Sequence, residues 1–181
     1  KKSAMRQLLA LAAGFLLLPL MMAVPFYEAV RTTTFDSAYF EMVSSFTTTG
    51  ATLFDPTRLS GPEHLWRAQV GWLGGLLMWV AAAAILAPLT LGGFEVTASG
   101  EPGQFGTETV RFERASSAKR LTQVTRQLAP IYIGLTAALW LLLVIGGDRP
   151  LVAVVHAMST LATSGISAVG GVEHAGSGFA G

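Results

Sequence analysis

Residues 33–52 read TTFDSAYFEMVSSFTTTGAT, the pattern of a short amphipathic helix that runs into a hydroxyl-rich loop with a lone glycine, Gly50. The helix is predicted over residues 34–46, and Thr33 and Asp36 have the spacing of an N-terminal capping box. About 13 helical residues reach roughly 19 Å, too short to cross the ~30 Å apolar core of a bilayer. The stretch lies between two uncharged apolar segments, so it predicts a loop that enters and leaves the membrane from one side.

The composition indicates a membrane protein. Hydrophobic residues make up 51% of the 181 positions and charged residues only 13%, whereas a soluble domain carries about 25% charged residues. The net charge of +1 and the lack of a basic run give no reason to expect nucleic-acid binding. The chain holds no cysteine, which excludes disulfides, thiolate metal sites and cysteine nucleophiles. It starts at Lys1 without an initiator methionine and stops in a glycine-rich stretch, so we expect an internal piece of a longer protein.

Three uncharged apolar segments are each long enough to cross a bilayer as a helix. They are the expected spans 8–27, 68–91 and 128–147. A cleaved signal peptide is the alternative for the first, but no small-residue cleavage site follows it and two further spans lie downstream. Trp66 and Arg67, just before the second span, are expected at the membrane interface, where an aromatic ring and a long cationic side chain fit.

Gly71, Gly74 and Gly75 recur at helical spacing in the second span. Small residues at this spacing let another backbone approach a membrane helix closely. We therefore expect this face of the span to pack against a neighbouring element.

A second copy of the opening pattern lies near the end of the chain. A shift of 115 residues places Ser44 on Ser159, Thr48 on Thr163 and Gly50 on Gly165 without gaps. Chance similarity between two small-residue loops is the alternative. Because the order of span, short pore helix and hydroxyl–glycine filter loop also recurs, the chain is predicted to be an all-α membrane protein. A complete unit adds a closing span, so one and a half units are present. The first unit covers 1–91 (spans 8–27 and 68–91, pore helix 34–46, filter 47–52), a cytoplasmic loop covers 92–127, and an incomplete second unit covers 128–181 (span 128–147, pore helix 151–162, filter 163–167).

The basic residues predict an orientation. Eight of the twelve lysines and arginines lie at the N-terminus or in the 92–127 loop. The positive-inside rule therefore places the N-terminus and this loop in the cytoplasm, and both short helices on the outer side. Residues 107–127 are expected to form an amphipathic helix with a solvated basic face; the alternative is a docking surface for a cytoplasmic partner.

The repeated helix and loop suit a cation. The C-terminal end of a helix carries about half a negative elementary charge, which stabilises a dehydrated cation. Gly50 and Gly165 can adopt backbone angles closed to other residues, so each loop can present carbonyl oxygens along a narrow axis. Rings of such oxygens replace the hydration shell of potassium, and the absence of carboxylates from both loops argues against a divalent cation. Glu41 and His156 hold equivalent places in the two short helices, where a packing role is favoured over a place in a vestibule.

Three motifs carry a resemblance to a known family. FTTTGAT at 46–52 and LWRAQVGWLGG at 65–75 resemble the first pore unit of the Trk/Ktr/HKT superfamily of potassium transporters, in particular its bacterial TrkH-type uptake subunits, and HAMSTLATSG at 156–165 resembles the second unit. The resemblance implies four units around one pore, potassium as the transported ion and no covalently bound cofactor. The chain departs from this pattern because it holds two of the four loops, and because Ser164 and Ile166 make the second loop less regular.

The same resemblance implies which residues coordinate potassium through their backbone and which flank them. The six coordinating residues would be Thr48, Thr49, Gly50, Thr163, Ser164 and Gly165, and the flanking ones Thr47, Ala51, Thr52 and Ile166. It also implies a homodimer of the full-length protein, a cytoplasmic nucleotide-binding regulatory subunit, and a place in the bacterial inner membrane in contact with lipid.

Three other classes predict different features. A secondary cation-coupled transporter would carry its Thr–Gly breaks inside full spans rather than after short helices between spans. A non-transporting membrane anchor or assembly subunit would have no need of a repeated filter. An enzyme is least expected, since His64, His156 and His174 share no metal-ligand spacing and no nucleophile has a base at a recognisable spacing.

Overall fold

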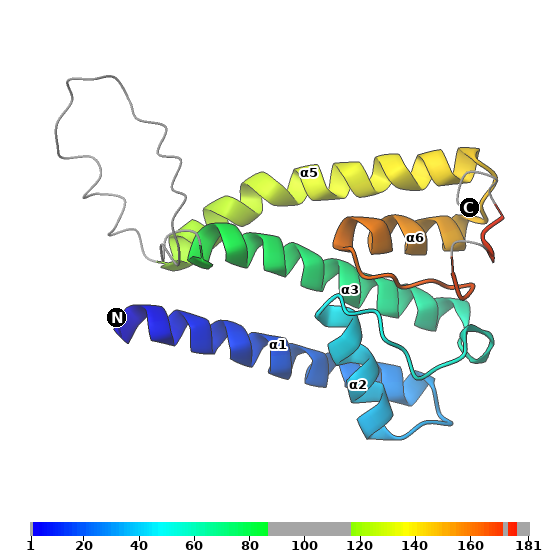
Figure 1. Cartoon of the computed structure of the whole chain (residues 1–181), viewed down its shortest axis with the longest axis horizontal. Coiled ribbons are helices and arrows are strands. Elements are labelled where there is room, and N and C mark those ends of the chain that lie inside the picture. Colours follow the sequence, from blue (N-terminus) through cyan, green and yellow to red (C-terminus); the bar gives the residue numbers. More distant parts are fainter. Residues whose placement is uncertain (1, 87–116, 172–173, 177–181) are drawn as a thin grey trace.

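The computed structural model describes residues 2–86, 117–171 and 174–176, and every regular element within these ranges is a helix. The elements are α1 (Lys2–Ala29), α2 (Phe35–Phe46), a 3-10 turn (Pro56–Arg58), α3 (Gly61–Ala81) with a π-helical extension (Ala82–Leu86), α5 (Ser117–Ile145) and α6 (Pro150–Ala162). The long helices α1, α3 and α5 lie side by side, and the short helices α2 and α6 lie at the same end of this bundle (Figure 1). The helix α2 packs against α1 and α3, and α6 packs against α3 and α5.

Local sequence accounts for the start of each short helix and of α3. The N-cap of α2 is Thr34, whose hydroxyl accepts a hydrogen bond from the Ser37 amide at 3.3 Å, so the capping box expected at Thr33 is wrong by one residue. The Glu63 carboxylate accepts from the Ser60 amide at 2.6 Å and caps α3. Proline at the first position of α6, Pro150, fits a site where the missing N–H costs nothing.

Several predicted boundaries differ from the observed ones. The helix α1 covers 2–29 rather than 8–27, and α3 begins at Gly61 rather than at residue 68, because the capped turn after Ser60 already nucleates it. Residues 117–127 are helical, as expected for that part of the 107–127 helix, but they run without a break into the third apolar helix, since no helix breaker precedes Pro130. The remainder of the 92–127 loop and of the 107–127 helix lies outside the described residues, as does the 87–91 end of the predicted second span.

Two helices of the described chain are long and apolar enough to cross a membrane, Met5–Ala29 and Arg120–Ile145. Only 11% of each apolar window is buried inside the protein, and large side chains such as Met21, Leu142 and Ile145 stay exposed. Exposed apolar surface on this scale fits contact with lipid. The described part of α3 does not meet this test because it opens on polar residues and carries several glycines.

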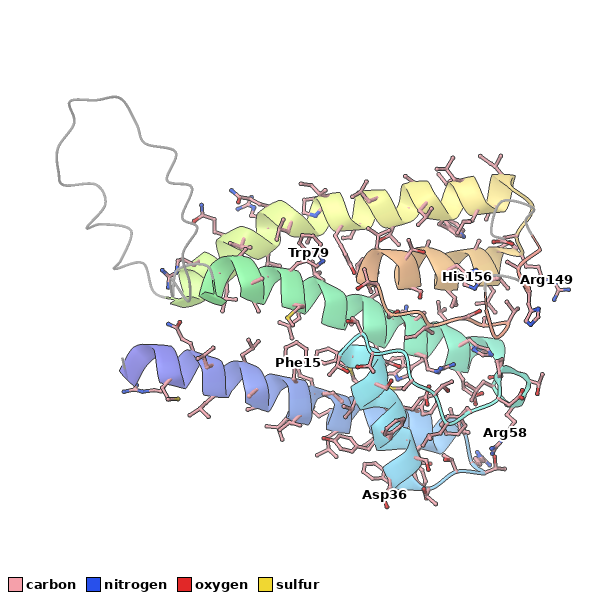
Figure 2. The ribbon with its side chains drawn as sticks, viewed as in Figure 1. Phe15, Asp36, Arg58, Trp79, Arg149 and His156 are labelled. Carbon is pink, nitrogen blue, oxygen red and sulfur yellow. The ribbon has the colours of Figure 1, made fainter. Side chains whose placement is uncertain are left out.

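Aromatic side chains form the core beneath the first loop. Phe15 projects from α1 toward α2 (Figure 2), and its ring centroid lies 5.4 Å from that of Phe46 at the end of α2. The rings of Phe26 and Phe54 meet edge to face at 5.7 Å, joining α1 to the chain that follows the loop. These contacts fix where α2 ends and where its loop returns.

Candidate functional site

The C-terminal ends of both short helices meet the same turn of α3. A Cβ on Gly74 would overlap the carbonyl oxygen of Phe46, the last residue of α2. A Cβ on Gly75 would lie 3.0 Å from the Cα of Ala162, the last residue of α6. The glycine face predicted from the spacing is therefore what admits both helix ends. Since each helix end carries about half a negative charge, two negative poles converge beside the middle of α3.

Both short helices end in the same way, with a threonine in the left-handed conformation. The φ angle is +56° at Thr48 and +54° at Thr163. After α2, the amides of Thr48 and Thr49 donate to the carbonyls of Ser45 (3.0 Å) and Ser44 (2.9 Å). After α6, the amides of Thr163 and Ser164 donate to those of Thr160 (3.2 Å) and Ser159 (2.9 Å). Each set of bonds is a Schellman motif, which normally carries glycine at the left-handed position.

A β-branched residue in the left-handed region is a true outlier, at a cost of about 1–2 kcal/mol. Such strain persists where the surrounding structure imposes it, and it concentrates at functional sites. The strain at Thr48 and Thr163 was not anticipated from the sequence, because threonine gives no local signal for this conformation. Its presence at both equivalent positions marks the two loops as constrained.

The two loops touch at their glycines. Gly50 has φ +74° and Gly165 has φ +67°, so both use the conformational freedom expected of them. A Cβ on Gly50 would overlap the carbonyl oxygen of Ser164 and lie 3.7 Å from the Cα of Gly165. The structure therefore brings Gly50 against Ser164 and Gly165, while the other predicted residues flank this contact along their own loops.

The carbonyl groups predicted as ligands differ in their surroundings: Ser164 is buried with its carbonyl oxygen against Gly50, whereas Thr49 and Gly165 are exposed residues. No described residue donates a hydrogen bond to the carbonyl oxygens of the six predicted coordinating residues, Thr48, Thr49, Gly50, Thr163, Ser164 and Gly165. Unpaired carbonyl oxygens are the ligands that a dehydrated potassium ion takes in a filter. No group of three or more histidine, aspartate or glutamate side chains that could hold a metal ion lies within the described ranges.

The loops also border cavities. A cavity of about 220 Å³ lies at the end of α2, with Thr47, Thr48 and Gly74 in its lining. A second, of about 350 Å³, borders the other loop, with Thr163 and Gly165 in its lining.

Three of the predicted flanking residues are held by hydrogen bonds or packing to the helices beside the loops. The Thr47 hydroxyl donates to the Val43 carbonyl at 2.7 Å and so helps to end α2. The Ile166 side chain is buried and packs with Ala68 and Val155. Ala51 accepts a hydrogen bond at its carbonyl from the Ser44 hydroxyl at 2.6 Å.

Glu41 and Arg67 form a buried ion pair. The Glu41 Oε1 lies 2.6 Å from an Arg67 Nη, and the exposed fractions of the two residues are 0% and 3%. The expectation that Arg67 reaches the membrane interface is therefore wrong, and Trp66 is also turned inward, donating from its indole N–H to the Met22 carbonyl at 3.3 Å. Glu41 was expected to serve packing, and its complete burial excludes a vestibule position.

His156 occupies the equivalent place on α6 (Figure 2) and is also buried. Its Nε2 lies 2.9 Å from the hydroxyl of Ser167, the last residue of the second loop. That hydroxyl accepts from the amides of Val169 (3.2 Å) and Gly171 (3.1 Å). His156 therefore contacts the return of the second loop, as Glu41 contacts the return of the first through the Leu53 amide at 3.1 Å.

No protein-family model matches the chain, and no solved structure matches it. It is similar to the Trk system potassium uptake protein TrkI of Halomonas elongata, with 34% identity over 156 residues, which cover 86% of this chain and 29% of the relative. It is also similar to the Trk system potassium uptake protein TrkH of Salmonella typhimurium, with 33% identity over 147 residues, 80% of this chain and 29% of the relative. The protein TrkG of the same system in Escherichia coli K12 is 33% identical over 135 residues, 74% of this chain and 26% of the relative.

The chain thus spans less than a third of the length of the curated relatives it matches. The three alignments cover 86%, 80% and 74% of the chain. Over most of its length the chain is therefore a TrkH-type sequence, related to a segment of the Trk system potassium uptake proteins.

Proposed function

We propose that this chain forms two quarters of a potassium-selective filter in a longer protein that takes up potassium across the bacterial inner membrane. The loops 47–52 and 163–167 would supply backbone carbonyls to the ion, with Thr48, Thr49, Gly50, Thr163, Ser164 and Gly165 as ligands. The contact of Gly50 with Ser164 carries the proposal, because it joins the two loops that the repeat pairs. The potassium uptake function named for the relatives supports the choice of ion.

The electrostatics of the site support a cation. Two helix C-termini end beside Gly74 and Gly75, and the carbonyls of the six proposed ligands have no donor among the described residues. Negative helix poles and unpaired carbonyl oxygens together stabilise a dehydrated cation and repel an anion. The absence of carboxylates from both loops favours a monovalent ion.

The proposed architecture is one and a half units of span, pore helix, filter loop and span. The shared helix ends and left-handed threonines at positions 115 residues apart support it. A secondary cation-coupled transporter would break its long helices at the ion site, whereas α1 and α5 run without interruption. The repeated loops after short helices favour the filter proposal over that class.

The remaining assignments belong to the same proposal. The N-terminus and the 92–127 region would face the cytoplasm, the exposed apolar faces of α1 and α5 would contact lipid, and the full-length protein would form a homodimer. A cytoplasmic nucleotide-binding subunit would regulate it; the word "system" in the names of the relatives supports further components.

The test is potassium uptake by transport-deficient cells that express the full-length protein carrying this segment. We expect Gly50→Asp to abolish uptake or its preference for potassium over sodium, because residue 50 needs a positive φ and has no room for a side chain. Gly134→Ala is the control, since a Cβ there meets nothing within 4 Å. Unchanged uptake and unchanged preference in the Gly50 variant would exclude the filter assignment.

A further inference from the structure

The Glu41–Arg67 pair is an expensive feature to bury. Removing two charges from water costs more than most ion pairs return, so a pair of well-packed apolar residues would often be at least as stable. A pair in this position, with exposed fractions of 0% and 3%, therefore calls for a role beyond stability.

The position of Glu41 on α2, within hydrogen-bond distance of the chain that leaves the first loop, indicates what that role is. Glu41 and Ser44 are three residues apart on α2 and so share one face of the helix. Ser44 donates its hydroxyl to the Ala51 carbonyl at 2.6 Å, and Glu41 Oε2 accepts from the Leu53 amide at 3.1 Å. Two side chains of one helix thus hold the outgoing limb of the loop immediately after Gly50.

Arg67 fixes the carboxylate that makes this contact. Its Nη binds Glu41 Oε1 at 2.6 Å, which leaves Oε2 for the Leu53 amide. Arg67 lies one turn before Gly71 of α3, and a Cβ on Gly71 would lie 3.2 Å from the Ser45 carbonyl. The loop, α2 and α3 are therefore connected through a single carboxylate.

The second loop is held from the equivalent helix position by other chemistry. His156, 115 residues after Glu41, binds the Ser167 hydroxyl, which in turn accepts from two amides of the returning chain. In both loops, a buried polar residue at this helix position contacts the chain that leaves the loop. The residue is a glutamate in the first case and a histidine in the second. The feature that the two loops share is therefore a hydrogen bond between the short helix and the chain that leaves the loop.

We propose that Glu41 is a positioning residue for ion selectivity: its carboxylate, oriented by Arg67, sets the path of the first loop by accepting the Leu53 amide. This rests on the proposed filter function. Glu41 itself would not contact the ion. A hydrogen bond to a charged acceptor is about twice as strong as one between neutral groups. The bond from the Leu53 amide to Glu41 would therefore keep the loop carbonyls in the one geometry that discriminates potassium from sodium.

The test measures potassium and sodium uptake per molecule of full-length protein in the membrane. We expect Glu41→Gln to lower the potassium-to-sodium ratio by roughly fivefold or more, the scale of one charge-assisted hydrogen bond. The exchanged pair Glu41→Arg with Arg67→Glu restores opposite charges, but arginine cannot accept the Leu53 amide. We therefore expect the exchanged pair not to restore the ratio. Matched controls are Glu28→Gln and Arg31→Met, which change exposed residues near the end of α1.

Three outcomes would overturn the proposal. The exchanged pair could restore the ratio, or Glu41→Gln could reduce only the amount of protein while the ratio per molecule stays unchanged. The third outcome applies if Glu41→Gln does not accumulate. Arg67→Lys keeps both charges but removes the guanidinium Nη that lies 2.6 Å from Glu41 Oε1, and an unchanged ratio in that variant would also overturn the proposal.

Gly50→Asp in the same assay separates the two proposals. If it changes the ratio and the Glu41 variants do not, the positioning role fails and the filter stands. If Gly50→Asp has no effect, the filter itself fails, whatever the Glu41 variants do.

Discussion

The α-carbon of Gly50 lies against the carbonyl oxygen of Ser164, so that a Cβ on residue 50 would overlap that oxygen. The equivalent glycine, Gly165, has a similar φ angle, but a Cβ there would meet nothing within 4 Å. The two positions therefore impose the same backbone requirement and very different steric ones. This asymmetry makes them a matched pair for experiment.

Gly50→Ala is expected to be much more harmful than Gly165→Ala. Both variants place an alanine at positive φ, which costs about 1–2 kcal/mol. The Gly50 variant must also push two backbone segments apart, which adds about 1–3 kcal/mol. Thermal unfolding of the purified full-length protein in detergent would measure the difference. Equal losses in the two variants would show that the Gly50–Ser164 contact does not exist in solution.

Thr48→Gly is expected to leave the free energy of unfolding unchanged or to raise it by about 0.5 kcal/mol. Relief of about 1–2 kcal/mol of left-handed strain offsets the roughly 0.5–1 kcal/mol that glycine loses in conformational entropy. Thr49→Gly is the control: Thr49 does not have a positive φ, so that variant loses backbone entropy and the 2.9 Å hydrogen bond between the Thr49 and Thr47 hydroxyls, with no relief of strain. The same unfolding experiment applies, and a Thr48 variant as unstable as the Thr49 variant would contradict the strain.

Patterns confined to a few neighbouring residues were predictable from the sequence, and contacts across the fold were not. The apolar run that follows Pro150 was enough to expect a helix over 151–162, which starts one residue after the observed α6. The start of α3 was missed because Gly61 and Pro62 resemble loop punctuation, although Ser60 and Glu63 have the spacing of a capping box.

At the candidate site, too, local features were predictable from the sequence and contacts between distant residues were not. Gly50 and Gly165 were expected to adopt special backbone angles because glycine alone does so freely. The burial of Arg67 was not predictable, because its partner Glu41 lies on another helix and the adjacent Trp66 suggested an interface. The left-handed conformation of Thr48 and Thr163 is imposed by the contacts of the whole loop, and a threonine in the sequence does not predict it.

Gly74→Ala is expected to destabilise the protein by about 1–3 kcal/mol, because its methyl group would overlap the Phe46 carbonyl and neither backbone is a flexible side chain that can yield. The displaced end of α2 should also lower potassium uptake per molecule. Gly134→Ala, on α5 with open space around it, should instead gain up to about 1 kcal/mol from the better helix propensity of alanine. If both variants behave alike in unfolding and uptake, the close approach of α2 to α3 is wrong.

Trp72, Tyr132 and Thr136 connect α3 to α5, and the hydroxyl of Thr136 is the centre of this network. It accepts from the Trp72 indole at 2.9 Å and donates to the Tyr132 carbonyl at 2.7 Å, while the Tyr132 hydroxyl donates to the Trp72 carbonyl at 3.2 Å. Thr136→Val keeps the shape but leaves the indole N–H without its acceptor, so we expect a loss of about 1–3 kcal/mol.

Thr136→Ser retains the hydroxyl and should lose only the contribution of one methyl group, about 0.8 kcal/mol. Tyr132→Phe removes one donor to a carbonyl and should lose about 1 kcal/mol. The double variant Tyr132→Phe with Thr136→Val should lose less than the sum of its parts, because both residues belong to one network. Detergent unfolding of the four proteins decides the matter: if the valine variant is no less stable than the serine variant, the hydroxyl does not join the two helices.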